Sequence, residues 1–492
     1  MELNELFKTL RENKINISLH GENLKVGSDA PDIDVLLLEK IRENKSQIID
    51  YLKTNISHKY EQIPLAPAAD AYPLSSAQMR LWILSQFEGG NTAYIIPTTY
   101  TLKGILNIEH FKRSLLSIVS RHEILRTVFR EDQNQDIKQY ILSLESMDIE
   151  INYKDLRDDE SRDEKVKKYI HEESVIPFNL HAGPLFRLGL FHLSDDYYVF
   201  SCVMHHIISD AWSIQVMIRE LFLTYNALTK NEIIPLTPLK VQYKDYSIWQ
   251  HSYKLSENMA ASKAYWLSQF SGDLPILDAF ADNARPKEKT YNGALYHKIF
   301  DQKLSKGLKE IIRSEGGTLF MGLTGLLKVL LFRYTNQSDI TLGTPIARRN
   351  HPDLKDQIGF YINTLALRTK FDGEDSFKVL LNKVKTVTIA SYEHQDYPFD
   401  ELVEELNLFR DTSRNPLFDI MISLQNVDIG SHNTRAKEIE GLKIESYESA
   451  FLGSMFDLTF DFGEVSGELY LSVNYNTDIY HSSTIERMCG HL

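Results

Sequence analysis

Residues 197–213 read Tyr-Tyr-Val-Phe-Ser-Cys-Val-Met-His-His-Ile-Ile-Ser-Asp-Ala-Trp-Ser and form the most informative stretch of the chain. Its first part is mostly apolar, β-branched or aromatic, which is typical of a buried strand. His205 and His206 follow this strand directly, and Asp210 comes four residues after the second histidine. A buried strand that leads into two imidazoles and a carboxylate indicates a place for proton chemistry.

The two histidines are expected to serve different purposes, because adjacent side chains of a strand point to opposite faces. Three interpretations fit them: packed core histidines, ligands of a zinc ion, or one packed histidine beside a general base. Cys202 and Cys489 lie far apart and no ligand cluster is near, so we expect no metal site. If one histidine is a general base, Asp210 is expected to be a buried, arginine-paired carboxylate that fixes the turn.

The composition of the chain narrows its class. Its 492 residues can bury two or more cores, and 43% hydrophobic with 25% charged residues is usual for a soluble globular protein. A net charge of −14 argues against a nucleic-acid-binding protein. No apolar run reaches the roughly 18 residues of a membrane span, and the N-terminus has no signal-peptide pattern. We therefore expect a cytoplasmic protein with no membrane or nucleic-acid partner.

The first 56 residues form a pattern of their own. Apolar residues at helical spacing come first, two short alternating segments flank a turn within residues 15–26, and a second apolar helical stripe follows. The pattern predicts a small helix-hairpin-helix domain over residues 1–56. Residues 57–71 contain prolines and alanines without periodicity, which predicts an extended linker.

The remaining sequence alternates helical and strand patterns and predicts two α/β lobes, one over residues 72–250 and one over residues 251–492. We expect helices at 108–120, 161–174 and 323–334, another beginning at Ser213, and strands at 185–190, 197–204, 340–343, 364–369 and 456–460. The histidine pair would thus lie between the end of a strand and the start of a helix. No glycine-rich loop carries the Lys-Ser or Lys-Thr of a nucleotide site.

Seven short segments resemble, in the family's order, the signature motifs of the condensation domains of nonribosomal peptide synthetases. Residues 205–211 are similar to the motif His-His-x-x-x-Asp-Gly. The other six segments are 75–84 (SSAQMRLWIL), 121–129 (RHEILRTVF), 243–249 (YKDYSIW), 358–364 (IGFYINT), 394–399 (HQDYPF) and 410–418 (RDTSRNPLF). Each segment is weakly specific alone, whereas the ordered set is highly specific.

The resemblance implies a fold and a reaction. Both lobes would adopt the chloramphenicol-acetyltransferase-like α/β fold and meet in a V, with the histidine motif at the floor of a tunnel. An upstream carrier protein would present an acyl or peptidyl thioester on its phosphopantetheine arm, and a downstream carrier an aminoacyl thioester. The acceptor amine would attack the donor carbonyl and form an amide bond. The chain would need no cofactor of its own, and as a fragment of a larger synthetase it would be followed by an adenylation domain.

The same resemblance implies roles for the motif residues. His206 would take a proton from the attacking amine or stabilise the tetrahedral intermediate, with His205 beside it and Asp210 as a structural group. Trp212 and Ser213 complete the motif, whereas Ala211 stands where the family has glycine. If that glycine serves a positive φ, alanine strains the turn, and if it serves space, the methyl group narrows the channel.

Two more residues receive roles from the resemblance. Arg348 and Arg349 lie in a segment where the family places an arginine that pairs with the motif aspartate, and we assign Arg349 to Asp210. The alternative is a solvated basic pair on a loop. Asn363 is expected to line the tunnel as a hydrogen-bond donor.

Arg80, Arg121 and Arg126 lie among apolar residues at helical spacing and are expected to pair with acids inside the first lobe.

Residues 1 to about 55 resemble the N-terminal docking domains of the tubulysin-synthetase type. This resemblance implies that the hairpin edge accepts, as an added strand, the C-terminal peptide of an upstream synthetase protein. The residues expected to contact that peptide are Lys14, Ile17, Leu19, Lys25 and Val26.

Related activities fit the sequence less well. An epimerisation domain needs a second acid-base residue in a glycine- and histidine-rich segment, a heterocyclisation domain has aspartate in place of the histidines, and a free-standing acyl-CoA acyltransferase has no use for a docking domain. The alternative outside catalysis is a degenerate condensation-like module that only recruits partner proteins. Such modules usually lose the second histidine, whereas His206 is present.

Overall fold

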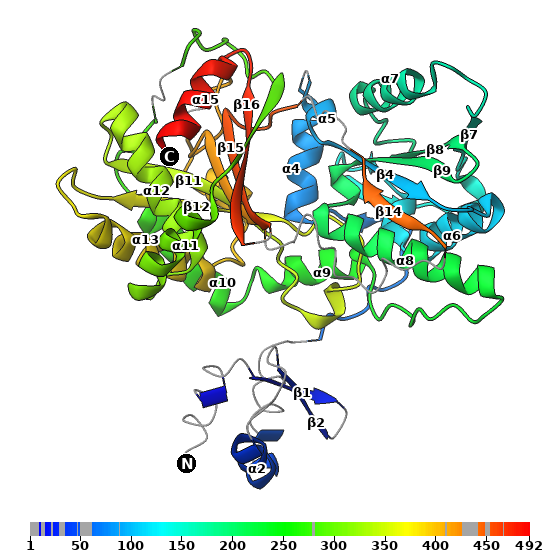
Figure 1. Cartoon of the computed structure of the whole chain (residues 1–492), viewed down its shortest axis with the longest axis horizontal. Helices are drawn as coiled ribbons and strands as arrows, with labels where there is room; N and C mark the ends of the chain where they lie inside the picture. The colour runs from blue at the N-terminus through cyan, green and yellow to red at the C-terminus, as the bar shows by residue number, and fades with distance from the viewer. Residues whose placement is uncertain are drawn as a thin grey trace. The chain divides into compact units, whose positions relative to one another are not determined.

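The computed structural model describes residues 9–10, 15–20, 23–28, 35–46, 48–49, 62–87, 89–277, 281–408, 411–425, 441–447, 453–465 and 467–492 (Figure 1). The chain divides into two compact units, Met1–Pro64 and Leu65–Leu492. Lys14 and Arg410, which the sequence analysis singles out, lie outside the described residues.

The first unit contains an antiparallel hairpin and a helix. Strand β1 (Ile15–His20) pairs with β2 (Asn23–Ser28), and helix α2 (Val35–Glu43) follows. The buried side chains of this unit are Leu10, Ile15, Leu37, Ile41 and Ile48. The predicted hairpin and second helix are confirmed, whereas the predicted first helix is described only at residues 9–10. Ile17, Leu19, Lys25 and Val26 all lie on the two strands.

The larger unit begins within the predicted linker. The backbone N–H of Ala66 donates to Asp245 Oδ1 at 2.7 Å. Asp245 lies in α9 (Tyr243–Tyr253), and its Oδ2 accepts from the backbone N–H of Gln242 at 2.6 Å. Residues from 65 onward therefore pack as part of the larger unit.

The first lobe is built on a five-stranded sheet with the order β14-β4-β9-β8-β7. Its elements are β4 (Ile95–Lys103), β7 (Ile151–Asp155), β8 (Phe186–Ser194), β9 (Tyr197–His205), β14 (Lys443–Ser446), α4 (Ser76–Leu84), α5 (Gly90–Ala93), α6 (Ile108–Arg121), α7 (Arg162–Val175) and α8 (Ala211–Lys230). A three-stranded sheet adds β3 (Tyr72–Pro73), β6 (Ile137–Ile141) and β5 (Thr127–Glu131). In Figure 1, α7 lies on one side of the five-stranded sheet and α6 and α8 lie on the other. The central strand β9 is buried along nearly its whole length, as its apolar sequence predicts.

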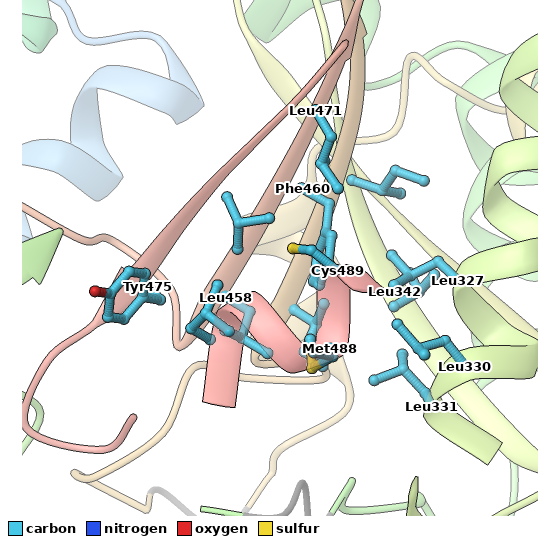
Figure 2. Packing of buried hydrophobic residues seen from close by; sticks show 14 of the residues in the cluster. Leu327, Leu330, Leu331, Leu342, Leu458, Phe460, Leu471, Tyr475, Met488 and Cys489 are labelled. Atoms are coloured by element: carbon cyan, nitrogen blue, oxygen red, sulfur yellow. The ribbon is translucent and has the colours of Figure 1, made fainter. Parts of the chain in front are cut away.

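The second lobe is built on a six-stranded mixed sheet with the order β10-β16-β15-β13-β11-β12. Its elements are β10 (Gly293–Ile299), β11 (Asp339–Ile346), β12 (Asn363–Lys370), β13 (Ile420–Gln425), β15 (Leu458–Val465), β16 (Glu468–Asn476), α10 (Glu257–Gln269), α11 (Gln302–Ser314), α12 (Leu319–Thr335), α13 (Phe377–Glu393), α14 (Phe399–Glu405) and α15 (Ser482–His491). Figure 2 shows apolar side chains of α12 and α15 packed against β11, β15 and β16. Burial of this face holds the sheet and its helices together.

One strand crosses between the lobes. Residues 443–446 form β14, which pairs antiparallel with β4 of the first lobe, with Lys443 opposite Lys103. The pairing supplies hydrogen-bond partners to a sheet edge, and Lys103 Nζ lies 2.7 Å from Glu445 Oε2. This crossover departs from the predicted division at residue 250, because a four-residue strand carries too little pattern to show which sheet it joins.

Within the described part of the chain, no single helix is long and apolar enough to cross a membrane, and the bent pair α11 and α12, at 105°, passes that test only jointly.

Candidate active site

The histidine motif forms the connection between β9 and α8. The strand ends at His205, residues 206–208 make one turn of 3-10 helix, and α8 begins at Ala211 rather than at the predicted Ser213. Asp210 caps the helix: its Oδ1 accepts from the backbone N–H and from the hydroxyl of Ser213, both at 2.7 Å. An aspartate at this position satisfies amides that lack partners in the helix, so the sequence itself fixes the turn.

His205 is a core residue. Its side chain is fully buried, and its Nδ1 accepts from the backbone N–H of Ile207 at 3.1 Å. The ring of Phe178 lies edge-on with a centroid distance of 6.1 Å. Burial, together with the neighbouring His206, lowers the pKa of His205 from 6.5 to about 3. His205 is therefore neutral at physiological pH and is held out of reach of a substrate.

His206 has the tautomer of a base. Its Nδ1 lies 2.8 Å from the carbonyl oxygen of Ser209, which can only accept, so Nδ1 carries the proton and Nε2 keeps its lone pair. The imidazole is half-buried, with Phe360 at a centroid distance of 4.9 Å and Tyr94 at 6.4 Å. Burial lowers the pKa of His206, which keeps the ring neutral near pH 7. A neutral imidazole with a fixed acceptor nitrogen is suited to proton transfer.

Asp210 and Arg349 form a buried ion pair between the lobes. Arg349 Nη2 lies 3.0 Å from Oδ1 and 3.2 Å from Oδ2 of Asp210, and the two side chains are 2% and 1% exposed. The backbone N–H of Tyr361 donates to Asp210 Oδ2 at 3.2 Å. Arg349 also donates to the carbonyls of Leu354 at 2.8 Å and Gln357 at 2.6 Å. With its oxygens occupied in this way, Asp210 is a structural carboxylate.

The neighbouring arginine has a different partner. Arg348 Nε lies 3.8 Å from Asp396 Oδ1, so the structure places Arg349, and not Arg348, against Asp210. The arginine pair is not a solvated pair on a loop, since both side chains are at least 90% buried. Trp212 and Ser213 add contacts between the same segments: Trp212 Nε1 donates to the carbonyl of Lys355 at 2.8 Å, and Ser213 Oγ accepts from the backbone N–H of Gly359 at 3.0 Å.

Ala211 does not strain the turn. It is the first residue of α8, its side chain is exposed, and it is not among the residues with positive φ. Of the two alternatives for this position, a positive φ does not apply to this chain. The methyl group of Ala211 can therefore matter only through the space that it occupies.

Replacing Ala211 with glycine is therefore expected to lower the free energy of unfolding slightly, by about 0.5 kcal/mol, because glycine gains backbone freedom in the unfolded chain. Urea denaturation of the two proteins measures the difference. A gain in stability on introducing glycine would contradict the helical geometry at this position.

Asn363 does not act as a free donor. Its Nδ2 donates to the carbonyls of Gln395 at 2.9 Å and Tyr397 at 2.8 Å, and its Oδ1 accepts from the backbone N–H of Phe399 at 3.0 Å. Both amide protons are thus used within the second lobe. Asn363 therefore ties the segment at 395–399 to β12.

A polar cluster next to His206 was missed by the sequence analysis. Arg80 of α4 lies 3.4 Å from Asp400 of α14, and the charges of both act on the hydroxyl of Tyr94. The side chains of Arg80 and Asp400 keep 24% and 30% exposure, yet burial raises the pKa of Asp400. The expectation that Arg80 pairs inside the first lobe is wrong, because Asp400 belongs to the second.

The other two arginines singled out in the sequence stay inside the first lobe. Arg121 Nε lies 3.1 Å from Glu220 Oε2, which also lies 2.9 Å from His122 Nε2. Arg126 binds backbone carbonyls, including that of Val119 at 3.2 Å. The expected pairing of Arg126 with an acid is not found among the residues that the structure describes. Among the described residues, no group of three or more His, Cys, Asp or Glu side chains is arranged to hold a metal ion.

Acid is expected to destabilise the fold through His205. Its folded-state pKa is depressed, so stability is full above pH 6.5 and is lost as the pH falls toward 3, because only the unfolded chain takes up the proton. Through this one group, the free energy of unfolding is expected to fall by about 2 kcal/mol between pH 7.5 and pH 5. In His205→Asn, whose Oδ1 can accept from Ile207, that part of the pH dependence should vanish in urea denaturation. An unchanged dependence would show that His205 is not the responsible group.

The sequence matches one protein family and several known peptide synthetases. The family model described as "Condensation domain" matches residues 68–492. Gramicidin S synthase 2 of Brevibacillus brevis is 36% identical over 445 residues, which are 90% of this chain and 10% of that protein. Bacitracin synthase 3 of Bacillus licheniformis is 37% identical over 443 residues, 90% of this chain and 7% of that protein. The chain thus spans only a small part of these relatives.

The fold has close structural neighbours. The crystal structure of the X-domain from teicoplanin biosynthesis has a TM-score of 0.79 at 22% identity and covers 87% of this chain and 95% of that one. This likeness shows the chloramphenicol-acetyltransferase-like α/β fold of the larger unit. Since the family match covers residues 68–492 and the synthetase relatives align over most of the chain, the protein belongs to the condensation domain family of nonribosomal peptide synthetases.

Proposed function

We propose that this chain forms an amide bond between two carrier-bound thioesters, with His206 as the group that handles the proton. Condensation domains of nonribosomal peptide synthetases transfer acyl groups and form peptide bonds, and their substrates arrive on phosphopantetheine arms. The observation that carries the proposal is the neutral His206, whose Nδ1 is bound by the Ser209 carbonyl and whose Nε2 is left as an acceptor.

The proposed step needs no cofactor of the protein itself. The amine of the downstream aminoacyl thioester attacks the carbonyl carbon of the upstream acyl thioester. A C–N bond forms, the C–S bond breaks, and the donor arm leaves as a thiol. His206 Nε2 accepts a proton from the attacking nitrogen or donates a hydrogen bond after protonation, which stabilises the tetrahedral intermediate. The proton can then pass to the departing sulfur.

Positioning is expected to supply more of the rate than the histidine does. Holding two reactants in place can contribute roughly 7–11 kcal/mol, whereas general acid-base help is typically about 10²–10⁴-fold. The Asp210–Arg349 pair serves positioning, because it fixes the turn that carries His206 against the second lobe.

The first unit is proposed to recruit the upstream synthetase protein. Its sheet, as described, has two strands, so an extended peptide could add to an edge through main-chain hydrogen bonds. Ile17 is partly buried against the core of this unit, which suits a supporting role. The charges of Lys14 and Lys25 would then determine which partner peptides bind. The synthetase relatives also support a downstream carrier and an adenylation domain as partners.

The test is intact-mass analysis of two carrier proteins mixed with this chain. One carrier is loaded with an acyl or aminoacyl donor and the other with an aminoacyl acceptor. The proposal expects the donor mass to appear on the acceptor carrier, and expects no gain when the acceptor amine is acetylated. Removal of residues 1–56 tests recruitment separately, because it should weaken transfer only from a donor that carries an upstream C-terminal peptide.

The competing proposal is a module that recruits partner proteins without catalysis. A folded chain that binds loaded carriers but transfers nothing across a broad panel of donors and acceptors would favour that function over amide formation.

A further inference from the structure

Lys289 is a half-buried lysine of the second lobe that the proposed reaction does not use. It precedes β10 in the second lobe, and its backbone N–H donates to the carbonyl of Thr412 at 2.9 Å. Its Nζ contacts Asn415 Oδ1 and lies 5.1 Å from the ring centroid of Tyr291 and 5.7 Å from that of Phe456. The side chain is half-buried, so part of its surface remains accessible.

The charge of Lys289 has no carboxylate of its own. Among the described residues, no carboxylate oxygen lies within 4 Å of Nζ. Two acids whose charges act on Lys289 are committed elsewhere: Asp457 pairs with Arg285, and Asp419 lies 2.7 Å from Arg414. Each of the two aspartates therefore forms an ion pair with an arginine, and neither is the counter-ion of Lys289.

An unmatched charge in this position is costly. Burial, reinforced by the charge of Arg80, lowers the pKa of Lys289 to about 7. An anion placed beside Nζ would restore the ordinary pKa and recover the lost interaction energy. A ligand with a negative charge beside Nζ would supply the partner that the lysine lacks.

The place of Lys289 connects it to the histidine motif. The Tyr291 ring packs against Gly89 of the first lobe, where an added Cβ would lie 3.3 Å from it. Tyr291 also lies in the electrostatic field of Tyr94 and Arg80. Tyr94 is the ring that lies 6.4 Å from His206. A series of neighbouring side chains, Tyr291, Arg80 and Tyr94, therefore connects Lys289 of the second lobe to His206.

We propose that Lys289 is a specificity-determining residue that binds a carboxylate on the side chain of a carrier-bound substrate. This inference rests on the proposed function, since it assigns the substrate class of the same site. A carboxylate would accept a charge-assisted hydrogen bond from Nζ, whereas the matching amide would leave the cation unpaired. Either the donor or the acceptor chain can supply the carboxylate.

The test measures equilibrium binding, which does not require catalysis. The acceptor probes are aspartyl and asparaginyl amides of aminopantetheine with a free amine, and the donor probes are the same compounds N-acetylated. All lack the phosphate, so that a preference reports the side chain. Calorimetric titration of the full chain is expected to show about ten-fold tighter binding of the aspartyl form in one of the two pairs.

The variants assign that preference to one residue. Lys289→Met and Lys289→Gln should bring the aspartyl and asparaginyl affinities together, whereas Lys289→Arg should keep most of the difference. Lys287→Met, which removes an exposed lysine two residues earlier, is the matched control and should keep all of it.

Two outcomes overturn the inference: a wild-type chain that binds the aspartyl and asparaginyl forms equally in both pairs, or a preference that survives in Lys289→Met. A preference that follows Lys289 in a chain that transfers no acyl group would count against the proposed function and not against the carboxylate site.

Discussion

His206→Ala is expected to lower acyl transfer between loaded carriers by about 10²–10⁴-fold, the range that general acid-base catalysis supplies. The reason is that alanine removes Nε2, the nitrogen that remains an acceptor when Nδ1 donates to the Ser209 carbonyl. Single-turnover transfer followed by intact mass gives the rate directly. Residual transfer from positioning alone should remain measurable.

Folding must be separated from chemistry in this experiment. His206 is half-buried, so its replacement should leave the urea denaturation curve nearly unchanged. His181→Ala is the matched control, because His181 is an exposed histidine of the same lobe and should transfer at the wild-type rate. A folded His206→Ala variant with full activity would remove the histidine from the mechanism.

Asp210→Ala is expected to destabilise the fold by about 3–5 kcal/mol, since it leaves the Arg349 guanidinium buried without its counter-ion. The same change removes the cap of α8 and the acceptor of the Tyr361 amide. The free energy of unfolding in urea measures the loss, and low soluble yield is an accompanying sign.

A double-mutant cycle isolates the pair itself. Asp210→Ala with Arg349→Met should be less destabilised than the sum of the two single variants, because the unpaired charge is gone. Arg219 and Asp356 offer a matched control: their ion pair also joins α8 to the second lobe at 2.6 Å, but the side chains are 37% and 57% exposed. Arg219→Ala should cost less than about 1 kcal/mol. Additive effects at Asp210 and Arg349 would contradict the coupling.

The local parts of the fold could be predicted from the sequence because their signals are local. The apolar run before His205 defines a strand, and the change to helical spacing after Asp210 defines α8. The helix begins at Ala211, two residues before the predicted start at Ser213. The sequence alone does not show that Asp210 caps the helix, because its hydrogen bonds to Ser213 are known only from the structure. The hairpin in the first unit followed from alternation alone.

Contacts between distant segments could not be predicted in the same way. Arg80 and Asp400 come from different lobes, and neither residue has a neighbour in sequence that indicates its partner. Asn363 was assigned to the tunnel by resemblance, although its amide is used by Gln395, Tyr397 and Phe399. Lys289 has no distinctive sequence context, and only the commitment of Asp419 and Asp457 to arginines marks its charge as unmatched.

The most direct test of the central claim is single-turnover transfer from a loaded donor carrier to a loaded acceptor carrier, measured by intact mass for the wild-type chain and His206→Ala in parallel. The account predicts that the donor mass moves to the acceptor carrier with the wild-type chain and moves at least about 100-fold more slowly with the variant. Equal rates for the two folded proteins, or no transfer by the wild-type chain with any loaded pair, would contradict it.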